Sequence, residues 1–87
     1  MSTIRKFGSK NMVEMSLGNK KVLFSYETPV VVFDGENYFI TNEKHSTTTT
    51  RQINFYMRQE NHPNSRNPNH LTQELLEKLA KKLHLIP

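Results

Sequence analysis

The sequence predicts an α+β fold, in which an antiparallel β-meander of three or four strands is followed by two helices packed on one face. Between residues 11 and 41, apolar residues alternate with polar ones or form short runs between turn-forming residues, as in strands. After Thr41, two segments carry apolar residues every three or four positions, which is typical of the buried side of a helix.

The length and charge of the chain limit its organisation and its partners. Its 87 residues suffice for one small core, so we predict a single domain over residues 1–87. The net charge of +4 favours an anionic partner, either a nucleic acid or an acidic protein surface. Solubility and ordinary basic helix ends are the alternative explanation of this charge. The sequence has no cysteine and therefore no disulfide.

Two observations predict a cytoplasmic protein without a membrane partner. No apolar run approaches the roughly 20 residues that cross a bilayer. The first six residues also lack the apolar stretch of a signal peptide.

The first strands follow from alternation and turn residues. Residues 1–10 are basic and weakly patterned, and we expect them to be mobile. Residues 12–17 alternate with Val13, Met15 and Leu17 on one face, and Gly18-Asn19 then provides a turn. Residues 21–26 form the next strand. A bend or an edge position is expected at Thr28-Pro29, because proline lacks the N–H that a central strand needs.

Asp34-Gly35 gives the clearest hairpin signal in the chain. It lies between a β-branched run, Val30 to Phe33, and an aromatic one, Tyr38 to Thr41. The first run is apolar on both faces, which indicates a central strand covered by the helices.

A helix is predicted from the N-cap Ser46 to about Gln59. At 100° per residue its two sides differ in polarity. The predicted buried side carries Thr49, Ile53, Tyr56 and Met57, and the opposite side carries Arg51, Asn54, Phe55 and Arg58.

A polar loop and a second helix complete the prediction. Residues 61–70 contain no large apolar side chain and two prolines, so we expect a loop that is a candidate for disorder. Thr72 is the predicted N-cap of the last helix. Its apolar stripe consists of Leu76, Leu79, Leu83 and Ile86, widened by Leu75. We expect this stripe to pack on the sheet, and a homodimer formed through it is the alternative.

The start of the first helix is the candidate binding site. Hydroxyl groups, free backbone N–H groups and arginine at a helix N-terminus suit an anion such as phosphate. The residues assigned to this nucleic-acid or anion site are Lys44, Ser46, Thr47, Thr48, Arg51 and Arg58. The alternative is a simple capped helix whose threonine methyl groups pack on the sheet.

Phe55 has three interpretations. An exposed aromatic ring between Arg51 and Arg58 could stack on a nucleic-acid base. It could equally lie in a protein interface, where aromatic residues and arginine are enriched. The third interpretation places it in the core, with a different helix phase.

The remaining polar residues predict neither a metal site nor catalysis. Histidines 45, 62, 70 and 84 have no metal-binding spacing, and the glutamates have no partner pattern typical of a nucleophile and its base. We therefore expect no cofactor and no metal, and we interpret the protein as a non-enzyme.

Two segments together resemble a family of short phage and prophage proteins of unassigned function. Residues 25–30, Ser-Tyr-Glu-Thr-Pro-Val, resemble the family's Ser-Tyr-x-Thr-Pro-Val strand. Residues 46–54 are similar to its Ser-x-Thr-Thr-x-Arg-His-Ile-Asn helix start, although Gln52 stands where the family prefers histidine. Tyr56, Met57 and His45 also depart from the family pattern. The resemblance implies a phage-encoded accessory protein in the host cytoplasm.

The leading hypothesis is a non-enzymatic module that contacts DNA or RNA through the basic helix face. The first alternative is a phage-encoded inhibitor of a host protein, such as an anti-CRISPR or other anti-defence factor, with Phe55 at its interface. The second alternative is a small structural component of a virion.

Overall fold

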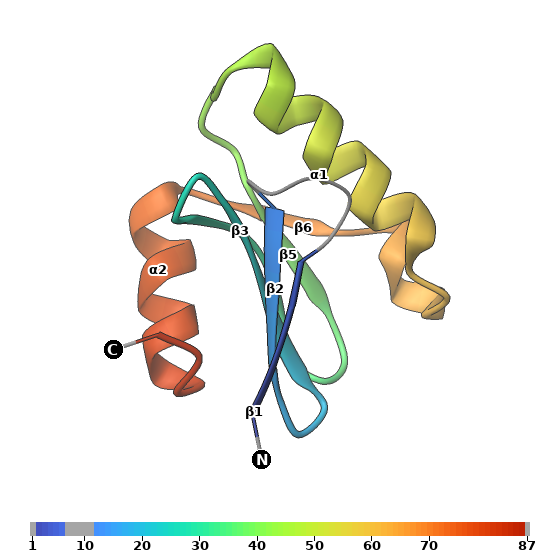
Figure 1. Cartoon of the computed structure of the whole chain (residues 1–87), viewed down its shortest axis with the longest axis vertical. Coiled ribbons are helices and arrows are strands. Elements are labelled where there is room, and N and C mark those ends of the chain that lie inside the picture. The colour runs from blue at the N-terminus through green and yellow to red at the C-terminus, as the bar shows by residue number, and fades with distance from the viewer. Residues whose placement is uncertain (1, 7–11, 87) are drawn as a thin grey trace.

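The computed structural model describes residues 2–6 and 12–86 and confirms the α+β class (Figure 1). An antiparallel meander is followed by a helix, a parallel strand and a second helix, and the strand order is β1-β2-β3-β4-β5-β6. The elements are β1 (Ser2–Lys6), β2 (Met12–Leu17), β3 (Lys20–Ser25), β4 (Thr28–Phe33), β5 (Tyr38–Thr41), α1 (Thr47–Gln59), the 3-10 helix η1 (Pro63–Arg66), β6 (Asn69–Leu71) and α2 (Gln73–Lys82).

The meander has one strand more than predicted. Residues 2–6, expected to be mobile, pair antiparallel with β2, with Ser2 opposite Leu17 and Lys6 opposite Val13. Residues 7–10, to which the same expectation applied, lie outside the described residues. β6 was not predicted at all, and it joins the far edge of the sheet parallel to β5.

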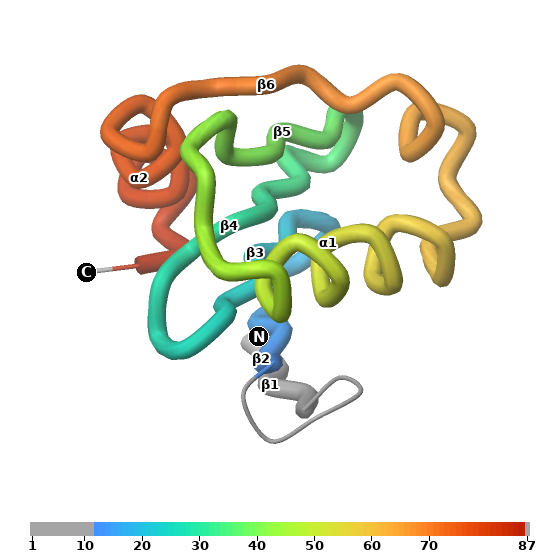
Figure 2. Tube along the Cα trace, turned by 90° about the horizontal axis from the view of Figure 1, so that it is seen from above, coloured from blue at the N-terminus to red at the C-terminus, as the bar shows by residue number. Residues whose placement is uncertain are grey.

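The two helices lie on opposite faces of the sheet, and not together on one face as expected (Figure 2). Neighbouring strand residues point to opposite faces. Accordingly, Val31 of β4 belongs to the apolar cluster that contains Ile53 of α1, whereas Val32 belongs to the cluster that contains Leu76 of α2. The apolar run of residues 30–33 is therefore covered on both faces. Within the described ranges, no helix is both long and apolar enough to cross a membrane.

The β3–β4 connection is a two-residue turn with unusual backbone angles. Tyr26 and Glu27 both have positive φ, 51° and 69°, although neither is glycine. Positive φ at both central residues is typical of the hairpin turn that matches strand twist. The bend expected at Thr28-Pro29 lies two residues earlier, and Pro29 is inside β4 beside a register shift at Leu23/Phe24.

The predicted Asp34-Gly35 hairpin is present, with a loop of four residues. Asp34 Oδ1 accepts hydrogen bonds from the backbone N–H groups of Glu36 (2.9 Å) and Asn37 (2.7 Å). Gly35 has a φ of +101°, which side-chain-bearing residues rarely adopt. The Asp34 carboxylate therefore stabilises the loop, and Gly35 allows the backbone to adopt the positive φ that the loop needs.

Both predicted N-caps are confirmed. Ser46 Oγ accepts from the Thr49 N–H (3.2 Å) at the start of α1, and Thr72 Oγ1 accepts from the Leu75 N–H (3.2 Å) at the start of α2. α2 ends earlier than its apolar stripe suggests. The chain turns at His84, whose φ is +62°, and this turn brings Leu85 to full burial.

Candidate functional site

The outer side of α1 presents the arginines and Phe55 to solvent, as the helix phase predicted. Arg51, Phe55 and Arg58 are exposed, and 40% of Phe55 remains accessible. The opposite side is buried through Thr49, Gln52, Ile53 and Tyr56. Phe55 is therefore not a core residue. The two arginines lie two helical turns apart, about 10 Å along the axis, with the aromatic ring between them.

The N-terminal end of α1 functions first as a cap. Ser46 Oγ accepts from the Thr49 N–H and donates to Thr49 Oγ1, both at 3.2 Å, so this hydroxyl serves the helix itself. Thr47 and Thr48 are exposed in the first turn, and Lys44 is exposed in the preceding loop. The backbone N–H groups of Thr47 and Thr48 lie in the first turn, where an α-helix has no internal acceptors. The structure thus places Lys44, Thr47, Thr48 and Arg51 near one end of the helix and Arg58 near the other.

A chain of hydroxyl groups connects this cap to the sheet. Ser25, the last residue of β3, donates to Gln52 Oε1 at 2.5 Å. Its oxygen therefore accepts from Thr49 Oγ1 (3.1 Å), which in turn accepts from Ser46. The donors thus run in one direction, from Ser46 through Thr49 and Ser25 to Gln52. None of these hydroxyl groups donates to a histidine or a carboxylate in these bonds.

A buried carboxylate holds the middle of α1. Tyr56 donates its phenolic hydrogen to Glu14 Oε2 on β2 at 2.6 Å. Glu14 is only 5% exposed, so this charge-assisted bond offsets part of the cost of burial. Burial, followed by the hydrogen bond to Glu14, raises the pKa of Tyr56 far above its ordinary value. Tyr56 consequently remains a donor throughout the neutral range.

A second carboxylate fixes the C-terminal end of α1. Glu60, the C-cap residue, accepts from Tyr38 of β5 (2.7 Å) and forms an ion pair with Lys21 of β3. Burial, followed by the hydrogen bond to Glu60, raises the pKa of Tyr38 above its ordinary value. Both carboxylates beneath α1 are thus engaged internally, and the helix itself carries no acidic residue.

These contacts predict the alkaline behaviour of the protein. Because the folded pKa values of Tyr38 and Tyr56 are raised, the stability they contribute is complete below the unfolded value of about 10 and is lost as pH rises above it. We expect Tyr38 and Tyr56 to remain un-ionised above pH 10, for as long as the protein stays folded. Ultraviolet absorbance of tyrosinate, followed together with circular dichroism, measures this. Simultaneous ionisation of all three tyrosines in folded protein would contradict it.

The polar residues that position the site were not predicted from the sequence. Glu14 alternates with apolar residues on β2 and no role was predicted for it, yet it is buried. Ser25 and Gln52 are also buried. A helical wheel does place Gln52 beside Thr49 on the inner side, which was the available signal for an internal hydrogen bond.

A small hollow lies between β5 and the first half of α1. It measures about 190 Å³, and its lining includes Glu43, His45, Asn54 and His70. The Nε2 atom of His45 is buried and has no hydrogen-bond partner among the described residues. Across residues 2–6 and 12–86, no group of three or more histidine or acidic side chains is arranged to hold a metal ion.

Comparison with known proteins gives a family match but no functional name. No curated protein and no solved structure matches the chain. A family described only as of unknown function (DUF8033) matches residues 2–73, which include the whole sheet and α1 and reach the first residue of α2. Because this match covers most of the chain, the protein belongs to the DUF8033 family of unknown function.

Proposed function

We propose that the protein is a phage-type accessory module that binds nucleic acid, without catalysing a reaction, through the outer side of α1. The observation that carries the proposal is that Arg51, Phe55 and Arg58 are exposed on one side of a helix that has no acidic residue. Arginine pairs with phosphate, and an aromatic ring between two arginines can stack on a base.

The contacts beneath α1 support this proposal. Glu14 accepts a hydrogen bond from Tyr56 on the inner side of α1, and Glu60, the C-cap residue, accepts one from Tyr38. Their negative charge is therefore held away from the outer side by the helix. The same contacts fix the helix on the sheet, so its arginines need little reorganisation to meet an anionic strand.

The accessory role in a phage rests on two stretches of sequence. Residues 25–30 and 46–54 resemble motifs of short phage proteins, and the structure brings these stretches together through Ser25, Thr49 and Gln52. One structural observation favours a second candidate, inhibition of a host protein: exposed Phe55 beside arginine is also typical of a protein-interface centre.

Replacing Arg51 and Arg58 together with glutamine tests the nucleic-acid proposal. Folding should be unchanged because both side chains are exposed. Loss of two phosphate contacts should reduce the slope of log affinity against log salt by about 1.4 for single strands and about 1.8 for duplexes. Fluorescence anisotropy with labelled DNA and RNA across a salt series measures this slope.

Two matched controls accompany the test. The double variant Lys81→Gln/Lys82→Gln removes the same charge from the exposed surface of α2 and should leave the slope nearly unchanged. Phe55→Ala should weaken binding by about 1–3 kcal/mol if a base stacks on the ring, whereas Leu75→Ala, at another exposed apolar residue, should not. Absence of salt-dependent binding by the wild type would refute the proposal. Loss of a host partner from pull-downs of the Phe55 variant would support the inhibitor function.

A further inference from the structure

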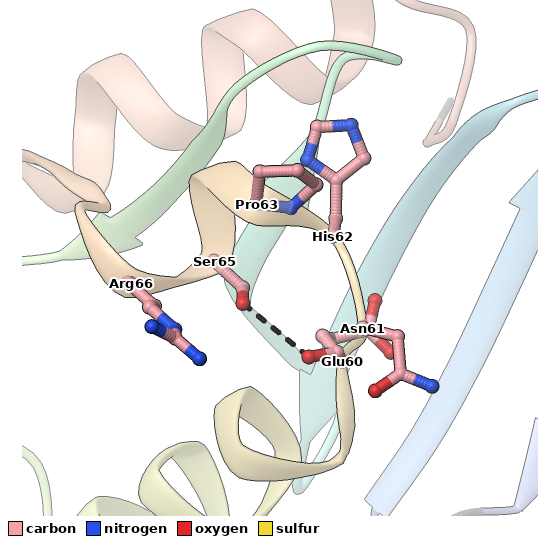
Figure 3. Close-up of a pocket in the computed structure, with 6 residues that line it drawn as sticks. All are labelled: Glu60, Asn61, His62, Pro63, Ser65 and Arg66. Atoms are coloured by element: carbon pink, nitrogen blue, oxygen red, sulfur yellow. Dashed lines mark hydrogen bonds between the residues drawn. The ribbon is translucent and has the colours of Figure 1, made fainter.

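The segment that follows α1 lines a half-open pocket. The pocket measures about 370 Å³ and lies within the range of about 300–1,000 Å³ that small-ligand sites occupy. It starts directly after the last residue of α1 and ends with η1 (Figure 3). Its lining residues are Glu60, Asn61, His62, Pro63, Ser65 and Arg66. Part of the polar loop expected over residues 61–70, a candidate for disorder, therefore lines a pocket.

Hydrogen bonds hold the pocket in shape without a ligand. His62 Nδ1 accepts from the Asn64 N–H (3.1 Å), and the Ser65 N–H donates to the His62 carbonyl (3.0 Å). The Asn64 side chain donates to the Glu36 carbonyl in the β4–β5 loop (2.6 Å). The ring of His62 contacts those of Phe33 and Tyr38 edge-on, at centroid distances of 5.0 and 5.9 Å. The pocket is thus connected to the sheet as well as to α1.

One side of the pocket carries a cationic group and the opposite side a neutral amide. Arg66 lies on one side and Asn61 on the opposite side, with the Ser65–Glu60 hydrogen bond (3.3 Å) between them (Figure 3). Arg66 and Asn61 are both exposed and offer donors, and the Asn61 amide also offers an acceptor. The Glu60 carboxylate is bound by Lys21 and Tyr38 and contributes little free negative charge.

The lining of the pocket offers separate groups to a charged and an uncharged part of a ligand. The exposed Asn61 amide offers both a donor and an acceptor to an uncharged, hydrogen-bonding part of a ligand. Arg66, which is exposed at the end of η1, provides the cationic group suited to a phosphate. A nucleotide has both parts, since its base carries donor groups and its phosphate carries the charge.

We propose that this pocket holds one unstacked nucleotide of a single-stranded nucleic acid, with the base beside Asn61 and the phosphate on Arg66. The inference rests on the proposed function and makes it more specific. Arg58 lies two residues before the pocket begins in sequence, so a strand that crosses the outer side of α1 reaches the pocket at the end of the helix. A paired base would first have to leave its duplex, which costs a few kcal/mol.

Binding of matched single and double strands tests this proposal. Labelled thymine and adenine homopolymers of about 12 nucleotides are compared with a duplex of the same length, within the usual range of single-strand site sizes. The wild type should bind a single strand at least about tenfold more tightly than the duplex. Arg66→Gln should reduce the salt slope for single strands by about 0.7, the value of one phosphate contact. Asn61→Leu should weaken single-strand binding about 3- to 10-fold without changing the slope, because it removes hydrogen bonds but no charge.

Control variants separate the pocket from general effects of charge and folding. Lys81→Gln makes the same charge change on exposed α2, and Asn69→Leu makes the same amide replacement at an exposed residue of β6 that does not line the pocket. Weaker single-strand binding by the pocket variants alone, with unchanged melting temperatures, supports the proposal. Binding of the pocket variants that equals their controls, or a wild type that prefers duplex, overturns the pocket assignment and leaves the α1 interface intact. A wild type that binds no nucleic acid overturns both.

Discussion

Leu76→Asp should prevent the protein from folding. Leu76 is fully buried in the apolar cluster between α2 and the sheet, with Val22, Val32 and Ala80. An unpaired carboxylate at that position costs several kcal/mol, and a domain of this length has a total stability of about 4–13 kcal/mol. Far-UV circular dichroism and thermal melting should show no cooperative transition.

The adjacent residue provides a control for this experiment. Leu75 is 50% exposed on the same helix, so Leu75→Asp should change the free energy of unfolding by less than about 1 kcal/mol. A folded Leu76→Asp protein with a wild-type melting curve would show that α2 does not pack on the sheet as described. Retained folding with loss of a dimer would instead favour self-association through this helix.

Gly35→Val should produce the second large loss of stability. The φ of +101° disfavours any L side chain, and a Cβ atom at this position would lie 2.6 Å from Asn19 Nδ2. The backbone penalty alone is about 1–2 kcal/mol. In a domain of this size, that loss lowers the melting temperature by about 4–16 °C.

Two further variants separate backbone strain from steric overlap. At Gly18 the φ is also positive, +61°, but a Cβ atom would meet no other atom within 4 Å. Gly18→Val should therefore destabilise the protein less than Gly35→Val. Asn19→Ala removes the overlapping side chain, so combining it with Gly35→Val should restore part of the stability. If the two glycine variants melt alike and Asn19→Ala restores nothing, the close approach to Asn19 is not a source of the effect.

The features that the sequence predicted well depend on neighbouring residues. Each N-cap, Ser46 and Thr72, bonds to a backbone group three residues later, and Asp34 bonds to groups two and three residues later. These interactions lie within one turn of chain, so residue type and spacing are sufficient to predict them. The same holds for the outward orientation of Arg51 and Phe55, which follows from helical periodicity.

The apolar patterns of the two helices do not show which face of the sheet each helix covers. An apolar stripe shows which side of a helix is buried but not which face of a sheet it covers. The relevant signal lay in β4, because a strand that is apolar on both faces needs a cover on each. The continuous run of residues 30–33 therefore argued for helices on opposite faces.

The buried polar contacts and the pocket were beyond the reach of sequence patterns. Glu14 and Tyr56 are 42 residues apart, and neither residue type indicates that the other is its partner. Residues 61–70 lack the large apolar side chains from which order is usually predicted. Their structure depends on Asn64, His62 and Ser65, whose hydrogen bonds replace an apolar core at this position.

β6 also affects how the sheet meets other chains. β5, with the sequence Tyr-Phe-Ile-Thr, has the aromatic and β-branched composition that favours intermolecular strand pairing when an edge is open. β6 occupies that edge, with Asn69, His70 and Leu71 opposite Phe39, Ile40 and Thr41, and Leu71 O accepts one further bond from the Asn42 N–H (2.7 Å). Its own outer edge is only three residues long and therefore offers an incoming strand few hydrogen bonds. The short parallel strand thus covers the β5 edge and protects it from pairing with a strand of another chain.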